Sequence, residues 1–236
     1  MQHSWFFAAS LVCLVPSLLA GPITYDISVN TASITGTVGS LDFNFNPGPL
    51  ATQSASLQIL GFSSNGTLGG SPVLTGDVSG ALPLTLTFDN ETGFNDYFEG
   101  FTFGTDLDFE VSLYGPALSS ADGVSTSGST FAFSMFSDAA GTTPALTSDT
   151  SEGFAVTVDV NLDGSTTLDN FSSQTTVAQK GMGGVPEPGP LPLIGLGIGL
   201  CIASRVRMRR CRQAENGNEV VSFTNQEKSL GGKRDV

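Results

Sequence analysis

The chain has 236 residues, a formal net charge of −13, 13% charged residues, 29 glycines and 17 phenylalanines. The phenylalanine content and the low charged fraction argue against a chain that is disordered throughout, and the length suits one or two domains. The acidic balance argues against a nucleic-acid-binding protein, which needs lysine and arginine to displace counterions from phosphates.

The charge is divided unevenly along the sequence. Residues 21–190 hold 18 Asp and Glu but a single basic residue, Lys180, and therefore carry a net charge of −17. Residues 191–236 hold eight basic and four acidic residues and carry a net charge of +4. An acidic stretch of this kind repels nucleic acid and anionic lipid headgroups, attracts cations such as Ca²⁺, and is typical of a solvated exported domain.

The N-terminal residues 1–20 contain an apolar run from Trp5 to Ala20, with Pro16 near its end. This pattern is typical of a secretory signal peptide, and we expect cleavage after Ala20. An uncleaved membrane anchor is the alternative. The signal peptide would export the acidic stretch that follows it.

Residues 21–174 show the alternation of hydrophobic and polar side chains that indicates β-strands. The alternating hydrophobic positions are Leu41, Phe43 and Phe45; Leu82, Leu84, Leu86 and Phe88; Leu107, Phe109, Val111 and Leu113; Phe131, Phe133 and Met135; and Phe154, Val156, Val158, Val160 and Leu162. Turn sequences such as Asn65-Gly66 and Asp163-Gly164 lie between them. The pattern predicts an all-β exported domain, an antiparallel β-sandwich of about 8–10 strands with the phenylalanines in its core.

A second apolar segment, Gly189 to Ser204, carries no charge over sixteen residues. As a helix it would span about 24 Å, against about 30 Å for the hydrocarbon core of a bilayer. Five arginines follow it: Arg205, Arg207, Arg209, Arg210 and Arg212. Their side chains can extend the span by reaching toward the interface, and they stop transfer on the cytoplasmic side. The sequence predicts a single C-terminal transmembrane helix over 191–204, followed by a basic cluster and polar cytoplasmic tail over 205–236.

The predicted linker, residues 175–190, is rich in glycine and proline and ends in Val185-Pro186-Glu187-Pro188. The order of this motif, a short Gly/Leu helix and an arginine cluster resembles the PEP-CTERM sorting signal of exported bacterial proteins. The resemblance covers about residues 185–212 and implies that an exosortase-like membrane enzyme recognises Pro186, Glu187 and Pro188. It further implies delivery to the cell envelope, the cell surface or the extracellular matrix. The chain differs from such tails in continuing beyond the arginines, from Gln213 to Val236.

The predicted exported domain offers little catalytic chemistry. His3 is the only histidine and lies in the signal peptide, and no cysteine occurs between residues 21 and 200. These counts exclude Ser-His-Asp and Cys-His catalysis and His-ligated zinc in that domain. Only carboxylates remain, and Asp106, Asp108 and Glu110 are the candidates for a glycosidase pair. Their alternation equally predicts the solvent face of a strand.

One segment resembles the start of a calcium-binding loop. Asp159, Asn161 and Asp163 occupy positions 1, 3 and 5, Gly164 follows at position 6, and Asp169 stands at position 11. The match ends at position 12, which is asparagine where such loops have a bidentate glutamate. The same residues are equally typical of a strand that ends in an Asp-Gly hairpin.

Three functions are compatible with these observations. We expect a non-catalytic exported protein with a structural or interaction role at the surface or in the matrix. The first alternative is a carbohydrate-binding or adhesive module with an exopolysaccharide partner, which requires exposed aromatic rings, and Tyr97 and Tyr114 are the candidates. The second alternative is a carboxylate-dependent hydrolase.

Overall fold

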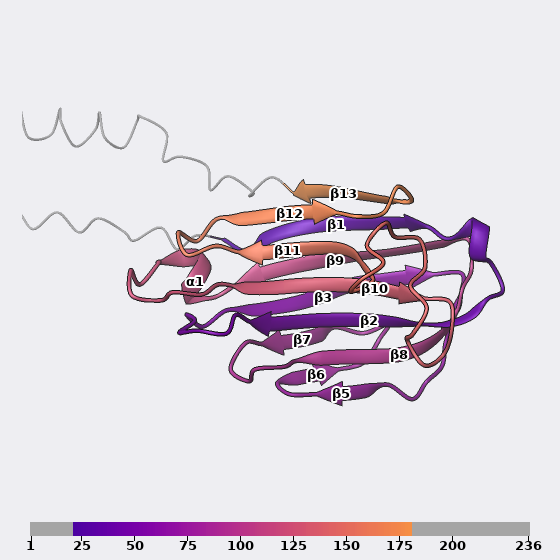
Figure 1. Cartoon of the computed structure of the whole chain (residues 1–236), viewed down its shortest axis with the longest axis horizontal. Coiled ribbons are helices and arrows are strands. Elements are labelled where there is room, and N and C mark those ends of the chain that lie inside the picture. The colour runs from indigo at the N-terminus through magenta and orange to yellow at the C-terminus, as the bar shows by residue number, and fades with distance from the viewer. Residues whose placement is uncertain (1–20, 181–236) are drawn as a thin grey trace, which may run out of the picture. The chain divides into compact units, whose positions relative to one another are not determined.

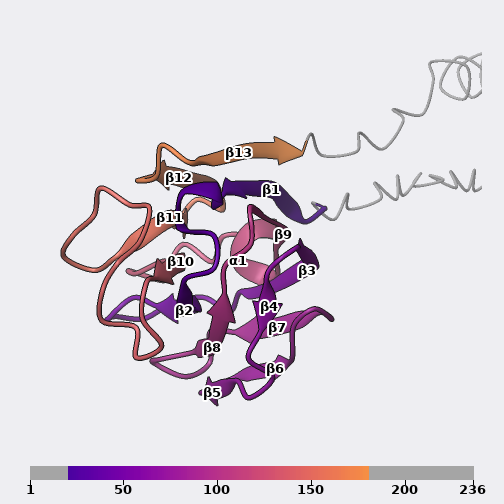
Figure 2. The same ribbon diagram turned by 90° about the vertical axis from the view of Figure 1, so that its right-hand side faces the viewer.

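The computed structural model describes residues 21–180, which form two antiparallel β-sheets packed face to face (Figures 1 and 2). Sheet A has six strands in the order β13 (Thr175–Lys180), β1 (Ile23–Asn30), β9 (Asp106–Tyr114), β3 (Ser56–Ser64), β7 (Leu86–Asp89) and β6 (Val78–Gly80). Sheet B has seven strands. Six follow the order β12 (Thr166–Asn170), β11 (Phe154–Val160), β10 (Ser129–Phe136), β2 (Val38–Pro47), β8 (Asp96–Thr102) and β4 (Thr67–Leu68), and the seventh, β5 (Val73–Thr75), also pairs with β8.

Helical structure in this part of the chain is limited to two short turns, η1 (Ala32–Ile34) and α1 (Pro116–Ser119). Among residues 21–180, no helix has the length and hydropathy needed to cross a membrane. The predicted signal peptide, the predicted transmembrane helix over 191–204 and the tail over 205–236 lie outside the described residues.

The core lies between the two sheets and is centred on phenylalanine side chains. Phe43 of β2 packs against Phe133 of β10, with ring centroids 4.9 Å apart, and against Phe109 of β9 at 5.2 Å. Phe109 and Phe133 are themselves 4.9 Å apart in an edge-to-face arrangement. Since Phe109 belongs to sheet A and the other two to sheet B, this triad joins the sheets. The predicted all-β sandwich with a phenylalanine core is confirmed.

The strand count differs from the expected 8–10, because the structure has thirteen strands. The extra strands β4, β5 and β6 have only two or three residues each and lie in a glycine-rich stretch without alternation. The predicted strand that begins at Leu82 in fact begins at Leu86. Leu84 is 76% exposed in a turn after Pro83, a residue that cannot donate to a strand ladder. Leu162 is also exposed, beyond the end of β11.

The sandwich extends past the predicted limit at residue 174. β13 pairs with β1 over six residue pairs, from Thr24–Lys180 to Val29–Thr175, and Val177 packs against the core. The predicted linker therefore begins six residues too early. The segment Thr175–Lys180 has only Val177 and Ala178 as hydrophobic residues, so its strand comes from pairing with β1 rather than from its own pattern.

Candidate binding face on the outer side of sheet B

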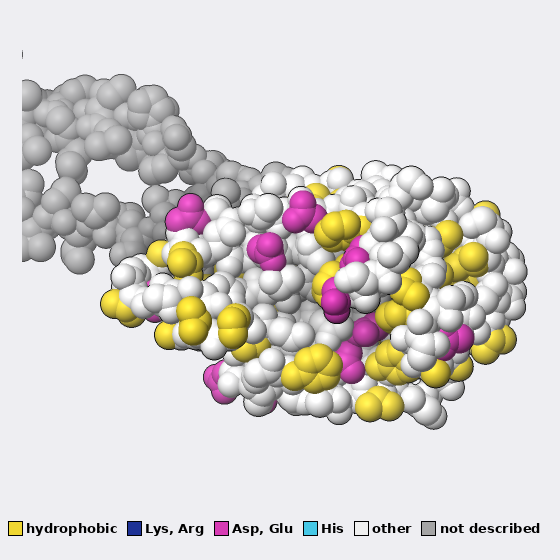
Figure 3. Space-filling view, viewed as in Figure 1, with side chains coloured by type: hydrophobic (Ala, Val, Ile, Leu, Met, Phe, Trp, Pro, Cys, Tyr) yellow, Lys and Arg dark blue, Asp and Glu magenta, His cyan; other side chains and the backbone are white. Residues whose placement is uncertain are grey.

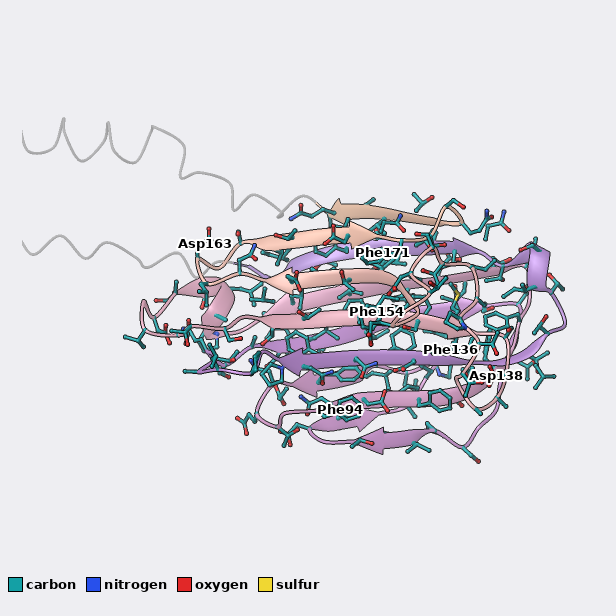
Figure 4. All side chains as sticks on the ribbon, viewed as in Figure 1. Phe94, Phe136, Asp138, Phe154, Asp163 and Phe171 are labelled. Carbon is teal, nitrogen blue, oxygen red and sulfur yellow. The ribbon has the colours of Figure 1, made fainter. Side chains whose placement is uncertain are left out.

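The side of sheet B that faces away from sheet A carries an unusual set of side chains (Figure 4). We call this surface the B face. Its residues alternate along each strand with the buried core residues. It includes Phe94, which precedes β8; Asp96 and Phe98 of β8; Asp42 and Asn44 of β2; Ala132 and Ser134 of β10; and Phe154, Thr157 and Asp159 of β11.

The strand register arranges these side chains in rows across the sheet. In one row, Asp42 lies between Phe98 and Ser134, and Phe154 lies beyond Ser134. Phe98 and Phe154 are therefore three strand spacings apart, about 14 Å. In the next row, Asn44 lies between Asp96 and Ala132, with Thr157 beyond. The B face thus has two aromatic rings separated by small and polar residues.

Two of the phenylalanines on this side are packed under the β10–β11 loop. Phe136 is only 7% exposed and, unlike its neighbours Phe133 and Met135, does not belong to the inter-sheet core. Gly141 and Gly153 of the loop approach it closely: an added Cβ at Gly153 would lie 3.2 Å from the Phe136 ring, and one at Gly141 would lie 2.8 Å from the Phe98 ring. The loop covers Phe136 and one edge of Phe98, while Phe154 and Phe171 remain half-buried and Phe94 is 54% exposed.

Asp42 and Asp96 form a carboxyl pair on the B face. Burial, together with the hydrogen bond and the charge of Asp96, raises the pKa of Asp42 to about 8, although the Asn44 amide donates to Asp42 Oδ1 at 2.6 Å. Burial also raises the pKa of Asp96. Asp96 Oδ1 is buried and receives no hydrogen bond from the described residues. A proton held between the two carboxyls accounts for these observations, because two adjacent carboxylates cannot both ionise at low cost.

Figure 3 shows acidic and hydrophobic side chains on this side of the domain, and no lysine or arginine of the described residues is visible there. Near the end of β11, a shallow pocket of about 250 Å³ is lined by Thr130, Asp159 and Asn161, among others. Asp159 Oδ1 accepts a hydrogen bond of 2.5 Å from the Thr130 hydroxyl.

The three predicted glycosidase candidates lie on the opposite side of the domain, on β9 of sheet A. Asp108 accepts a hydrogen bond of 2.5 Å from the Ser28 hydroxyl, and Glu110 pairs with the Lys180 ammonium group, which also lies 3.0 Å from Asp26. Asp106 is exposed and accepts a hydrogen bond from the Thr105 hydroxyl. These side chains occupy the solvent side of a strand, as the alternation indicated.

The predicted calcium ligands have separate local roles. Asp163 Oδ1 accepts hydrogen bonds from the Ser165 hydroxyl and backbone N–H, at 2.6 and 2.9 Å, and these bonds lower the pKa of Asp163. The Asn161 amide donates to the Ser165 and Thr167 hydroxyls, while Asp169 lies on β12 opposite Thr157. Residues 21–180 contain no group of three or more acidic, histidine or cysteine side chains that could hold a metal ion. Calcium binding stays a prediction.

The two tyrosines predicted to bind carbohydrate do not lie on the B face. Tyr97 is fully buried, and its hydroxyl donates to the Glu99 carboxyl at 2.5 Å. Tyr114 is half-buried at the end of β9 in sheet A. The aromatic residues of the B face are phenylalanines instead. Phe154 shares its parity with Val156, which predicts a core position, but an irregularity in the β10–β11 ladder pairs it with Ser134 on the outer side.

The sorting motif (Val185, Pro186, Glu187 and Pro188) and the five stop-transfer arginines lie outside the described residues. Comparisons with protein-family models, with curated proteins and with solved structures found no match for the chain.

Proposed function

We propose that this chain is an exported protein, carried to the cell surface or extracellular matrix by its C-terminal sorting segment. We propose further that its β-sandwich domain acts there as a non-catalytic binding module. The first half of the proposal depends on the sequence. An N-terminal apolar run, the VPEP motif and an apolar segment followed by arginines occur in the order that export and sorting require.

The second half depends on one observation, the B face. Soluble sandwich domains usually present polar residues on the outer side of each strand. Here Phe98 and Phe154 lie on the outer side with Asp42 and Ser134 between them, and Phe94 is more than half exposed. Aromatic side chains left partly in water on one sheet face mark a binding surface.

A binding role also suits the chemistry that the domain lacks. Residues 21–180 contain no histidine and no cysteine, so histidine general-base catalysis and thiol chemistry have no residue to perform them. Asp42 and Asp96 are close enough for each to shift the pKa of the other, whereas glycosidase carboxyls stand roughly 5 Å or more apart to accommodate the substrate or a water. The carboxyl pair therefore does not suit glycoside hydrolysis.

Protease digestion of intact cells tests the proposal. In cells that express the protein natively, proteinase K added outside should remove the domain from an immunoblot and leave a cytoplasmic marker intact. A Glu187→Ala variant, and separately a Pro186→Ala/Pro188→Ala variant, should retain the domain in the membrane fraction instead of at the surface. A domain that becomes sensitive only after the cells are lysed and that fractionates with cytosol would overturn the proposal.

A further inference from the structure

We propose that the B face binds a neutral polysaccharide chain that runs across the strands from β8 to β11. This inference rests on the proposed function and names the class of ligand for its binding module.

The aromatic residues supply the stacking surface. Phe98 follows Asp96 at the alternate position of β8 and lies on the B face, and Phe94, which precedes β8, is 54% exposed. Phe154 lies about 14 Å across the sheet from Phe98, and Phe171 follows β12 on the same side (Figure 4). Sugar rings have apolar C–H faces that pack on aromatic rings, and rings spaced across several strands suit an extended chain of sugars.

The polar side chains between the rings supply hydrogen bonds. Asp42 and Asn44 lie on β2, Asp159 lies on β11, and all three are half-buried on the B face. Carboxyl and amide oxygens accept hydrogen bonds from sugar hydroxyls, which are the donors that a glycan offers in number. The residues on β10 between them, Ala132 and Ser134, are small and buried, so the larger side chains on either side of β10 form the accessible part of this face.

Charge decides which glycans fit. The described residues contain one basic side chain, Lys180, and it is engaged by Asp26 and Glu110 on sheet A, on the other side of the domain. A polysaccharide that bears carboxylate or sulfate groups would meet like charge on the B face without a compensating cation. The same acidic surface could attract a basic peptide. The outward phenylalanines favour the glycan. A basic peptide could be attracted by acidic groups alone, so the row of apolar rings would have no part in binding it.

Affinity electrophoresis of the full-length chain in mild detergent tests the inference. Native gels cast with neutral laminarin, dextran or hydroxyethylcellulose should retard the protein in at least one case, and gels cast with alginate should not. Phe98→Ala and Phe154→Ala should each weaken the retarding interaction roughly tenfold, the effect expected on losing one aromatic stacking contact. Tyr114→Ala, which removes an aromatic ring from sheet A, is the matched control and should bind as the unmodified protein does.

A variant at an exposed position separates loss of binding from loss of the fold. Phe94→Ala should weaken binding with an unchanged thermal melt, because that ring is more than half in solvent. The inference is overturned if no neutral polysaccharide retards the protein, or if the phenylalanine variants bind as tightly as Tyr114→Ala. Retardation by poly-lysine alone, lost in moderate salt and on Asp42→Asn substitution, would identify a basic partner and overturn it as well.

Failure here is distinct from failure of the proposed function. If no polysaccharide gel retards the protein but protease digests the domain on intact cells, only the polysaccharide inference is rejected. Protection of the domain within the cytosol rejects the proposed function, whatever the gels show.

Discussion

Asp42 of β2 and Asp96 of β8 are neighbouring carboxyls on the B face: Asp42 lies in the row between Phe98 and Phe154, and Asp96 lies beside Asn44 in the next row. Burial raises the pKa of both groups, and that of Asp42 reaches about 8. At neutral pH Asp42 therefore holds its proton. This arrangement places a hydrogen-bond donor and acceptor together on the surface assigned to ligand binding.

The first prediction concerns stability above neutral pH. A carboxyl whose pKa is raised in the folded state holds its proton while the unfolded chain loses it, so stability falls as pH rises from about 4 toward about 8. We expect the thermal midpoint to be lower at pH 8.5 than at pH 5.5. Asp42→Asn should reduce this difference, with a gain on the order of 1–3 kcal/mol at pH 8.5. A pH dependence equal in the variant and the unmodified protein would contradict the shared proton.

The second prediction concerns stability in acid. Although burial alone would raise it, hydrogen bonds from the backbone N–H groups of Thr142 and Thr143 lower the pKa of Asp138 to about 2. A carboxyl with a lowered folded-state pKa contributes stability that is present above about pH 4 and is lost as pH falls through its folded value. Asp138→Ala should therefore lower the melting temperature at pH 6 and flatten its decline between pH 4 and pH 2. Glu91→Gln, at an exposed position, is the control and should leave the acid profile unchanged.

The third prediction concerns the buried Tyr97–Glu99 pair. Glu99 is 2% exposed, and its carboxyl accepts hydrogen bonds from the Tyr97 hydroxyl and from the Gly70 backbone N–H at 2.8 Å. The Tyr97 hydroxyl also accepts from the Leu82 N–H, at 3.1 Å. Tyr97→Phe leaves the Glu99 carboxyl and the Leu82 N–H without that partner and should cost about 1–3 kcal/mol of unfolding free energy. Urea denaturation measures this, and Tyr114→Phe should change it little. Equal effects of the two variants would contradict the assigned role.

The fourth prediction separates the core from the B face. Phe43 packs against Phe109 and Phe133 and is fully buried, so Phe43→Ala should cost about 3–5 kcal/mol. Phe94→Ala, at an exposed position, should cost less than about 1 kcal/mol. Chemical denaturation compares the two. Similar costs would mean that the Phe94 ring stabilises the fold, which would contradict its assignment to the binding surface.

The long strands could be predicted from alternation, because a half-buried strand shows its buried face in the sequence. Phe131, Phe133 and Met135 illustrate this: all three are buried in the core, as their spacing predicted. Short strands such as β5 could not be predicted, since three residues contain no period, and β13 depends on its partner β1 for its conformation.

The candidate site was harder to predict than the fold. Phe154 has the spacing of a core residue and is turned outward by the irregular pairing of β10 with β11, which only the three-dimensional register reveals. The nearness of Asp42 to Asp96 depends on the pairing of β2 with β8, over fifty residues along the chain. Phe136, by contrast, is out of phase with Phe131 and Phe133, and that signal was present in the sequence.

Labelling of single cysteines on intact cells tests the central claim most directly. Residues 21–180 contain no cysteine, so with Cys13, Cys201 and Cys211 replaced by serine the protein can carry one thiol, at Ser28 on sheet A or at Asn44 on the B face. A membrane-impermeant maleimide should label Ser28→Cys on intact cells, and should label Asn44→Cys only after the protein is purified away from surface polysaccharide. Labelling of neither position before lysis would contradict export, and equal labelling of both on intact cells would contradict an occupied B face.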